Sequence, residues 1–402
     1  MTSVCTCPNC GAAGMSVFYQ QDQVPVHSVV LLRTREAAVS YPRGDLQLAF
    51  CGACGFVSNV AYDPSLQDYS SDYEASQAFS PTFGAFAVNL ARRLVADYDL
   101  HRKTIIEIGC GQGEFLNLLC ALGDNRGIGF DPAYVEGRED LALSVGGAAL
   151  PQPRPGQVEF IPDYYSEQYA DRHADLVVCR MTLEHIQQTG DFVRMVRRSL
   201  EGQPDAVVFF QVPDVTRVLR DHAFWDIYYE HCSYLSPQSL ARLFQWHGFQ
   251  VLNLSTEYDG QYLMIEARPD GAHGFVGPDD DVRDLAAEVR GFAREYPGAV
   301  ERWRAEFAEA HAAGRRTVIW GAGSKGVAFL TTLGLNDEVG YAVDINPNKR
   351  GTFMAGTGHE IVSPEFLREY RPDTVVVMNP VYRDEIAGSL AALGLSPRLL
   401  TV

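Results

Sequence analysis

Four cysteines near the start of the chain have the spacing of metal ligands. Cys7 and Cys10 form one C-x-x-C-G motif, and Cys51 and Cys54 form a second. Each motif lets two thiolates converge on one ion, and the following glycine relaxes the tight turn, so we expect a structural zinc site. Cys5 could replace Cys7, although its spacing is worse. The alternative is a redox dithiol, for which one motif would suffice and which no surrounding βαβ pattern supports.

A second group of chemically suited residues lies where an apolar run turns into glycines. Thr104–Ile108 is predicted to be a buried strand, a glycine-rich turn follows it, and Glu114–Leu122 is predicted to be a helix. Glycines at such a turn let the backbone approach a ligand closely. Gly127–Asp131 is predicted to be the next strand, and its terminal Asp131 is placed to accept two hydrogen bonds from a ribose diol.

An acid before the glycines distinguishes two classes of cofactor. NAD-binding turns usually have the spacing G-x-G-x-x-G and must leave room for a pyrophosphate. Here the spacing is G-x-G-x-G, and Glu107 stands two residues before Gly109. A carboxylate at that position repels a pyrophosphate and suits the ammonium group of an amino acid. A turn that binds nothing is the alternative, but the glycines and both acids occur in register.

This stretch resembles the first motif of the class I S-adenosylmethionine (SAM) methyltransferases, E-x-G-x-G-x-G. The resemblance implies that Glu107, Gly109 and Gly111 contact SAM and that Asp131 binds its ribose. It also implies that Asp163, just past the third predicted strand, holds the adenine amino group. The alternative for Asp163 is a helix cap, because acids after strands often have that role.

Strands and helices alternate after residue 104, which predicts an α/β fold with a doubly wound parallel sheet. Met181 follows the fourth strand at the carboxyl edge, where ligands of such sheets bind, and Met181–Ile186 again matches the methyltransferase pattern. Helices are expected over Pro81–Leu100 and Ser236–His247, and two antiparallel strands are expected to complete the sheet. The predicted strands are Thr104–Ile108, Gly127–Asp131, Val158–Ile161, Ala174–Arg180, Ala206–Val212, Gln250–Leu254 and Tyr262–Arg268.

Aromatic residues crowd around Glu230 and His231 in the segment 221–236. A lone histidine is more often structural than catalytic. Here the neighbouring carboxylate could orient the imidazole, and the aromatic side chains could form a substrate pocket.

Together these features resemble the sugar C-methyltransferases, which methylate a carbon of nucleotide-linked 4-keto-deoxysugars. The resemblance rests on the cysteine pairs, the E-I-G turn, the histidine after the fourth strand and a Y-H-E-H-like segment, and it covers essentially the whole chain. By motif, Tyr73, His185, Glu230 and His231 take the places of the family's active-site tyrosine, histidine and Glu-His pair. The family's fold is a class I methyltransferase Rossmann-like sheet, flanked by a small N-terminal zinc domain and a C-terminal Rossmann-like domain.

The implied chemistry is methyl transfer to carbon, which requires a proton next to a carbonyl to leave first. His231 is expected to remove that proton with Glu230 beside its ring, while Tyr73 and His185 hold the enolate oxygen. An O- or N-methyltransferase acting on another natural product is the alternative. A non-catalytic protein that binds SAM or zinc is the third hypothesis.

Three stretches depart from the family pattern. Tyr229 replaces the first histidine of Y-H-E-H, Gly260–Met264 replaces G-G-S-x-R, and Pro25–Ser28 replaces P-L-A-N. We expect these changes to lie where the substrate binds. They therefore affect which acceptor is methylated more than they affect the methyl-transfer reaction.

The C-terminal part begins with a charged segment, Asp279–Gly314, which is predicted to be a helical connector broken at Pro297-Gly298. A strand from Thr317, a G-x-G-x-x-G turn from Gly321 and a strand ending at Asp344 follow. Alone, this motif is weak evidence for NAD. The stretch covers about half of a full dinucleotide fold and resembles the family's C-terminal domain, which binds no NAD, so a packing or substrate-binding role is expected.

Charge and composition limit the partners. The formal net charge is −18, and residues 1–70 carry three basic against five acidic residues, so neither nucleic acid nor an anionic membrane is expected as a partner. Without a long apolar run or a signal-peptide pattern, a cytoplasmic protein is expected, as a monomer or dimer.

We predict a zinc domain over 1–70, a methyltransferase domain over 71–270, and a connector with a Rossmann-like domain over 271–402. A small-molecule acceptor, such as a nucleotide-linked deoxysugar of antibiotic biosynthesis, is the expected partner.

Overall fold

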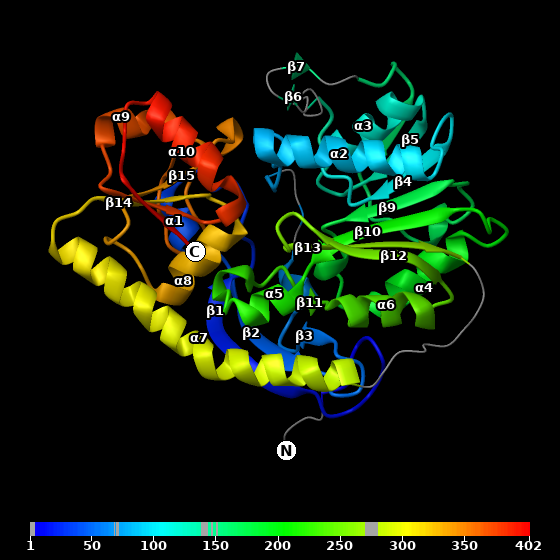
Figure 1. Ribbon diagram of the computed structural model, residues 1–402, viewed down its shortest axis with the longest axis horizontal. Coiled ribbons are helices and arrows are strands. Elements are labelled where there is room, and N and C mark those ends of the chain that lie inside the picture. Colours follow the sequence, from blue (N-terminus) through cyan, green and yellow to red (C-terminus); the bar gives the residue numbers. More distant parts are fainter. Residues whose placement is uncertain are drawn as a thin grey trace.

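The computed structural model describes residues 5–67, 69, 72–137, 144–145, 148–149, 152–269 and 280–402 (Figure 1). Within these residues the strands form an N-terminal, a central and a C-terminal sheet, together with a short hairpin of β6 (Ser144–Val145) and β7 (Ala148–Ala149). The predicted domain boundaries at 70/71 and 270/271 fall outside the described residues and stay predictions.

The N-terminal sheet is antiparallel and takes one strand from far along the chain. Its order is β1-β2-β3-β11, and β11 pairs with β3 through Ser233 opposite Ser58. The segment just after His231 therefore belongs to the N-terminal sheet, which the sequence pattern did not indicate. Its elements are β1 (Ser16–Pro25), α1 (Arg35–Val39), β2 (Arg43–Phe50), β3 (Val57–Asn59) and β11 (Ser233–Tyr234).

The central sheet has the order β12-β13-β10-β9-β4-β5-β8. The strands from β10 to β8 are parallel, and β13 and β12 add the antiparallel pair that was predicted. Its strands are β4 (Thr104–Ile108), β5 (Arg126–Phe130), β8 (Val158–Ile161), β9 (Leu176–Arg180), β10 (Val207–Pro213), β12 (Gln250–Glu257) and β13 (Tyr262–Arg268). Its helices are α2 (Pro81–Asp97), α3 (Glu114–Gly123), α4 (Thr189–Ser199), α5 (Val215–Arg220) and α6 (Pro237–Trp246).

Helices cover both faces of the central sheet, as its continuous apolar strands require. On β4, Ile105 packs in the cluster of α2 and α3, whereas Ile106 packs with α4 and α6. Figure 1 shows the sheet between α2 on one side and α4 and α6 on the other. Ser236 caps α6, because its hydroxyl accepts a hydrogen bond from the Ser239 amide at 3.2 Å.

The C-terminal sheet is parallel, with the order β16-β15-β14-β17-β18. This is the Rossmann-like arrangement that was expected for this part of the chain. Its elements are β14 (Thr317–Trp320), α8 (Ser324–Leu333), β15 (Tyr341–Val343), β16 (Ile361–Val362), α9 (Leu367–Tyr370), β17 (Thr374–Val377), α10 (Arg383–Ala392) and β18 (Arg398–Thr401).

The connector is one helix, α7 (Asp280–Ala312), which continues through Pro297. The predicted break at Pro297-Gly298 was therefore wrong. Proline removes one backbone hydrogen bond and kinks a helix, but burial of apolar side chains on both sides of it can keep the helix intact. Phe292 and Phe307 are both buried in the cluster shared by the N- and C-terminal sheets.

Candidate active site and metal centre

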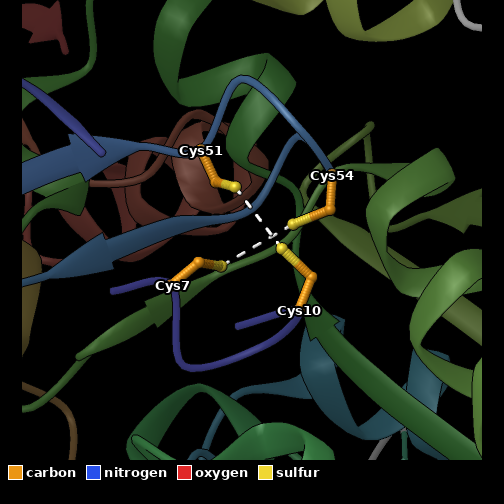
Figure 2. A group of neighbouring side chains, drawn as sticks. All are labelled: Cys7, Cys10, Cys51 and Cys54. Atoms are coloured by element: carbon orange, nitrogen blue, oxygen red, sulfur yellow. Dashed lines mark hydrogen bonds between the residues drawn. The ribbon is translucent and has the colours of Figure 1, made fainter. Parts of the chain in front are cut away.

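The four predicted zinc ligands converge on one point (Figure 2). The sulfurs of Cys7 and Cys54 are 3.7 Å apart, those of Cys10 and Cys51 are 3.6 Å apart, and all four lie within 4.8 Å of one another. Tetrahedral zinc with Zn–S bonds of about 2.3 Å needs sulfurs about 3.8 Å apart. The residues present therefore fit a zinc ion.

The two cysteine turns have the same local structure. The Gly11 amide donates to the Cys7 carbonyl, and the Gly55 amide donates to the Cys51 carbonyl, both at 2.9 Å. Both glycines have positive φ, +74° and +78°, as tight turns require. Cys5 stands outside the four-sulfur group, so the alternative ligand set is not the one that the structure brings together.

A cavity of about 410 Å³ lies at the carboxyl ends of β4, β5 and β9. The backbone at Gly109 suits glycine, because φ is +70° and a Cβ would lie 2.0 Å from the Thr182 hydroxyl oxygen. All six residues predicted to contact SAM line this cavity: Glu107, Gly109, Gly111, Asp131, Asp163 and Met181.

Glu107 is a buried carboxyl group in this cavity. It is 2% exposed, and its Oε2 atom has no hydrogen-bond partner. Burial raises the pKa of Glu107 to about 8, against the opposing effect of the Arg180 charge. A cation bound beside it would favour the ionised form, which is the expected effect of an amino-acid ammonium group.

The other two acids that were predicted to contact SAM differ in their surroundings. Asp131 accepts hydrogen bonds from the amides of Gly111 and Ala133, each at 2.8 Å, which fixes the carboxylate at the end of β5. Asp163 instead accepts from the hydroxyl group of Tyr169 at 2.7 Å and from the amide of Tyr164 at 2.7 Å. The hydrogen bond from Tyr169 lowers the pKa of Asp163, so this side chain is an ionised acceptor at neutral pH.

A second cavity of about 300 Å³ lies between the central and C-terminal sheets. Tyr73, His185 and His231 line it, so three of the four predicted catalytic side chains meet there. The two cavities share Tyr73, Ala75, Ser76, Gln77, Met181 and His185. They are therefore adjacent, and these six residues form the wall that they share.

The carboxylate beside His231 is not the predicted one. The carboxylate of Glu230 faces away and accepts from the Ser28 amide at 3.0 Å, with His27 Nδ1 at 3.2 Å from its other oxygen. The predicted contact between Glu230 and the ring of His231 is therefore wrong, because successive side chains of this loop point in different directions. Instead, Glu184 Oε1 lies 4.0 Å from His231 Nε2.

Glu184 and His27 were missed as site residues in the sequence. Glu184 belongs to the Met181–Ile186 stretch that matched the methyltransferase pattern, immediately before His185, and this position was the available signal. His27 lies in a stretch that departs from the family pattern. Its pairing with Glu230 spans more than two hundred residues, so no local pattern indicates it.

Both imidazoles of the second cavity are neutral at physiological pH. Burial lowers the pKa of His185 to about 4, and burial together with the nearby charge of Lys325 holds the pKa of His231 well below its usual value. The Tyr69 hydroxyl lies 2.8 Å from His185 Nδ1 and fixes that ring. Burial also raises the pKa of Tyr73, so its phenol stays protonated and can donate a hydrogen bond.

The departures from the family pattern lie only partly at the second cavity. Tyr229 is 1% exposed and contacts neither of the two cavities, and its hydroxyl accepts from the Asp63 amide at 2.9 Å. The expectation that Tyr229 lies where the substrate binds was therefore wrong. Tyr262, from the Gly260–Met264 stretch, does line the second cavity.

The C-terminal glycine turn faces the second cavity through Gly321, Gly323 and Lys325. Asp344, which in a dinucleotide fold would bind a ribose, accepts instead from the Ala322 amide at 3.1 Å and lies 3.4 Å from Lys349 Nζ. The carboxylate of Asp344 thus stabilises the C-terminal glycine turn. This is consistent with the packing or substrate-binding role that was expected for the C-terminal domain.

Comparisons with known proteins identify the class of enzyme. Residues 83–254 match a family described as a methyltransferase domain, and residues 283–395 match the C-methyltransferase C-terminal domain. C-methyltransferase NovU of Streptomyces niveus is 31% identical over 297 residues, covering 70% of this chain and 67% of that protein. The chain is a SAM-dependent methyltransferase. Within that class, it belongs to the family of SAM-dependent C-methyltransferases.

Solved structures resemble part of the chain. PH0226 protein of Pyrococcus horikoshii OT3 has a TM-score of 0.36 and 15% identity, covering 52% of this chain and 96% of its own. Magnesium protoporphyrin IX methyltransferase of Synechocystis PCC 6803, with bound SAM, has a TM-score of 0.33 and 17% identity, covering 49% and 86%. Among the helices of the described residues, none combines the length and apolar character that a membrane crossing requires.

Proposed function

We propose that the chain methylates a carbon next to a carbonyl group in a small-molecule acceptor, such as a nucleotide-linked keto-deoxysugar of antibiotic biosynthesis. The observation that carries the proposal is the meeting of two cavities. One contains the predicted SAM contacts, the other contains a neutral histidine, and Tyr73, Met181 and His185 lie between them. In-line transfer needs this arrangement, because acceptor carbon and methyl group must approach within about 3 Å.

SAM supplies an electrophilic methyl group, whose bond to sulfur breaks with the electron pair remaining on sulfur. His231 takes a proton from the acceptor carbon, and the electrons of that C–H bond form an enolate. The enolate carbon then forms the new carbon–carbon bond to the methyl group as that group leaves sulfur. Tyr73 donates a hydrogen bond to the enolate oxygen, with His185 as the second donor. Glu184 faces His231 and stabilises the imidazolium that forms when the proton arrives.

The acceptor is proposed to bind between the central and C-terminal sheets. Tyr228 and Tyr262 provide aromatic surface there, and the C-terminal glycine turn provides backbone amides. The ring centroids of Tyr228 and His231 are 4.2 Å apart, so a bound acceptor would lie beside the base.

The test is His231→Asn with a nucleotide-linked 4-keto-deoxysugar as acceptor. We expect turnover to fall by at least about a hundredfold while calorimetry shows unchanged affinity for S-adenosylhomocysteine. Wild-type enzyme should also exchange the acceptor's α-proton with deuterated water. Methylation without such exchange would indicate an oxygen or nitrogen acceptor, and full turnover by the variant would overturn the role of His231.

We also infer that Cys7, Cys10, Cys51 and Cys54 bind a structural zinc ion. The sulfur distances support this, and so does the position of the cluster, because none of the four cysteines lines either cavity. Cys7, Cys51 and Cys54 pack in the same apolar cluster as helix α6. Zinc there would stabilise the N-terminal segment against the central sheet.

A further inference from the structure

Arg180 is the last residue of β9 and lines the first cavity. Strand β4 runs beside β9 in parallel, with Glu107 opposite Val178. The carboxyl ends of parallel strands meet at the same edge of a sheet, so Arg180 and Glu107 reach the same cavity from neighbouring strands.

The contacts of Arg180 leave part of its guanidinium group available. Its Nε atom donates to Gln211 Oε1 at 2.8 Å, and its guanidinium carbon lies 3.9 Å from the centroid of the Phe115 ring. In the described part of the chain, no carboxylate oxygen lies within 4.0 Å of this guanidinium. The two Nη nitrogens are therefore free to bind an anion, and their planar fork suits a carboxylate.

Arg180 is half-buried, and an unpaired charge that is partly withdrawn from water is costly unless something compensates it. Burial lowers the pKa of Arg180, and the charges of Glu107 and Glu114 oppose that effect, although a guanidinium stays protonated throughout. Glu107 has an unpartnered oxygen in the same cavity. A guanidinium group and a carboxyl group that each lack a close partner are complementary to a zwitterion, whose ammonium group favours the ionised form of Glu107.

We propose that Arg180 binds the α-carboxylate of SAM, while Glu107 receives its ammonium group. Arg180 is a residue that the motif resemblance did not assign. With both contacts, each ionised group of the amino-acid end of the donor meets a group of complementary charge. Gln211 and Phe115 hold the guanidinium group in place for this contact.

The experiment compares two ligands by calorimetry in the full chain. One is S-adenosylhomocysteine, and the other is its decarboxylated analogue, 5′-(3-aminopropylthio)-5′-deoxyadenosine. We expect wild-type protein to prefer the carboxylate by about ten- to a hundredfold. Arg180→Met should lose this preference by weakening S-adenosylhomocysteine alone, and Arg180→Lys should keep part of it.

The measured quantity is the ratio of the two affinities within one variant. A general loss of structure would weaken the binding of both ligands together and would leave this ratio unchanged. Arg316→Met is the matched control, because Arg316 also stacks on an aromatic ring, that of Tyr370, and lines neither cavity. An unchanged ratio in Arg180→Met would overturn the proposal. Because neither ligand transfers a methyl group, the result is independent of the acceptor and of His231.

Discussion

Glu74 and Asn346 join the central and C-terminal parts of the chain through a hydrogen bond of 3.0 Å from Asn346 Nδ2 to Glu74 Oε1. Asn348 donates to the other oxygen of the same carboxylate, also at 3.0 Å. Glu74 is 3% exposed and adjoins Tyr73, at the start of the wall between the two cavities. The C-terminal part therefore holds one end of that wall in place.

Loss of this link should reduce catalysis more than donor binding. Asn346→Ala removes one of two donors to Glu74 Oε1, the other being the Ser76 amide at 3.3 Å, and costs about 0.5–1.5 kcal/mol of stability. We expect a lower kcat, because Tyr73 is less well positioned, with a smaller change in affinity for S-adenosylhomocysteine. Asn336→Ala, an exposed position of the same domain, is the control. Equal kcat in both variants would contradict this role.

Zinc loss should act on stability first. Cys51→Ser or Cys54→Ser removes one of four ligands, so we expect purified protein to lose its bound zinc and to unfold at a lower temperature. Cys5→Ser should keep both, since Cys5 stands outside the cluster. Elemental analysis and thermal unfolding measure the two effects. If wild-type protein without zinc unfolded at the same temperature as wild-type protein with zinc, this would be evidence against the metal site.

Donor binding should depend on pH through Glu107. With a pKa of about 8 in the empty protein, this carboxyl is mostly protonated at pH 7. The ammonium group of the ligand favours the ionised form, so binding near pH 7 releases a proton and affinity rises as pH increases through about 8. Calorimetry in buffers of different ionisation enthalpy counts the proton. Glu107→Gln should abolish its release, whereas release that persists would point to another group.

Glu184 should give the rate a separate pH dependence. Burial raises its pKa to about 8, so the carboxylate that stabilises the imidazolium of His231 forms only as pH rises through that value. At saturating substrates we therefore expect kcat to increase across this range, and Glu184→Gln to remove the increase. His231 itself, with its lowered pKa, should cause no loss of rate until well below pH 6.5. Glu230→Gln should keep the kcat increase, because Glu230 contacts His27 instead.

Segments with strong local signals were predictable from the sequence. Thr104–Ile108, Val158–Ile161 and Tyr262–Arg268 were predicted with the bounds that the structure has, because turn signals flank each apolar run. The four cysteines were predictable for a similar reason, since C-x-x-C spacing fixes the local geometry of each pair. The glycine turn brought Glu107, Gly109 and Asp131 to one cavity as expected.

Features that depend on distant contacts were not predictable. The direction of the Glu230 side chain is set by His27 and Ser28, which lie in the loop after β1, about two hundred residues earlier in the chain. The burial of Tyr229 depends on Gly44, whose missing Cβ leaves room for the tyrosine ring. Helix α7 continues through Pro297 because of packing on both sides of it, which local propensity does not include.

The backbone of β11 has a consequence for any attempt to shorten this enzyme. The Cys232 carbonyl accepts from the Asn59 amide at 2.9 Å, and the Cys232 amide donates to the Glu184 carbonyl at 3.0 Å. Asn59, a few residues after the second cysteine turn, is thus bonded to Cys232 beside the proposed base, and Cys232 is bonded in turn to Glu184. Deleting the N-terminal segment would free His231 from its anchorage, so a transplanted central sheet alone would make a poor minimal catalyst.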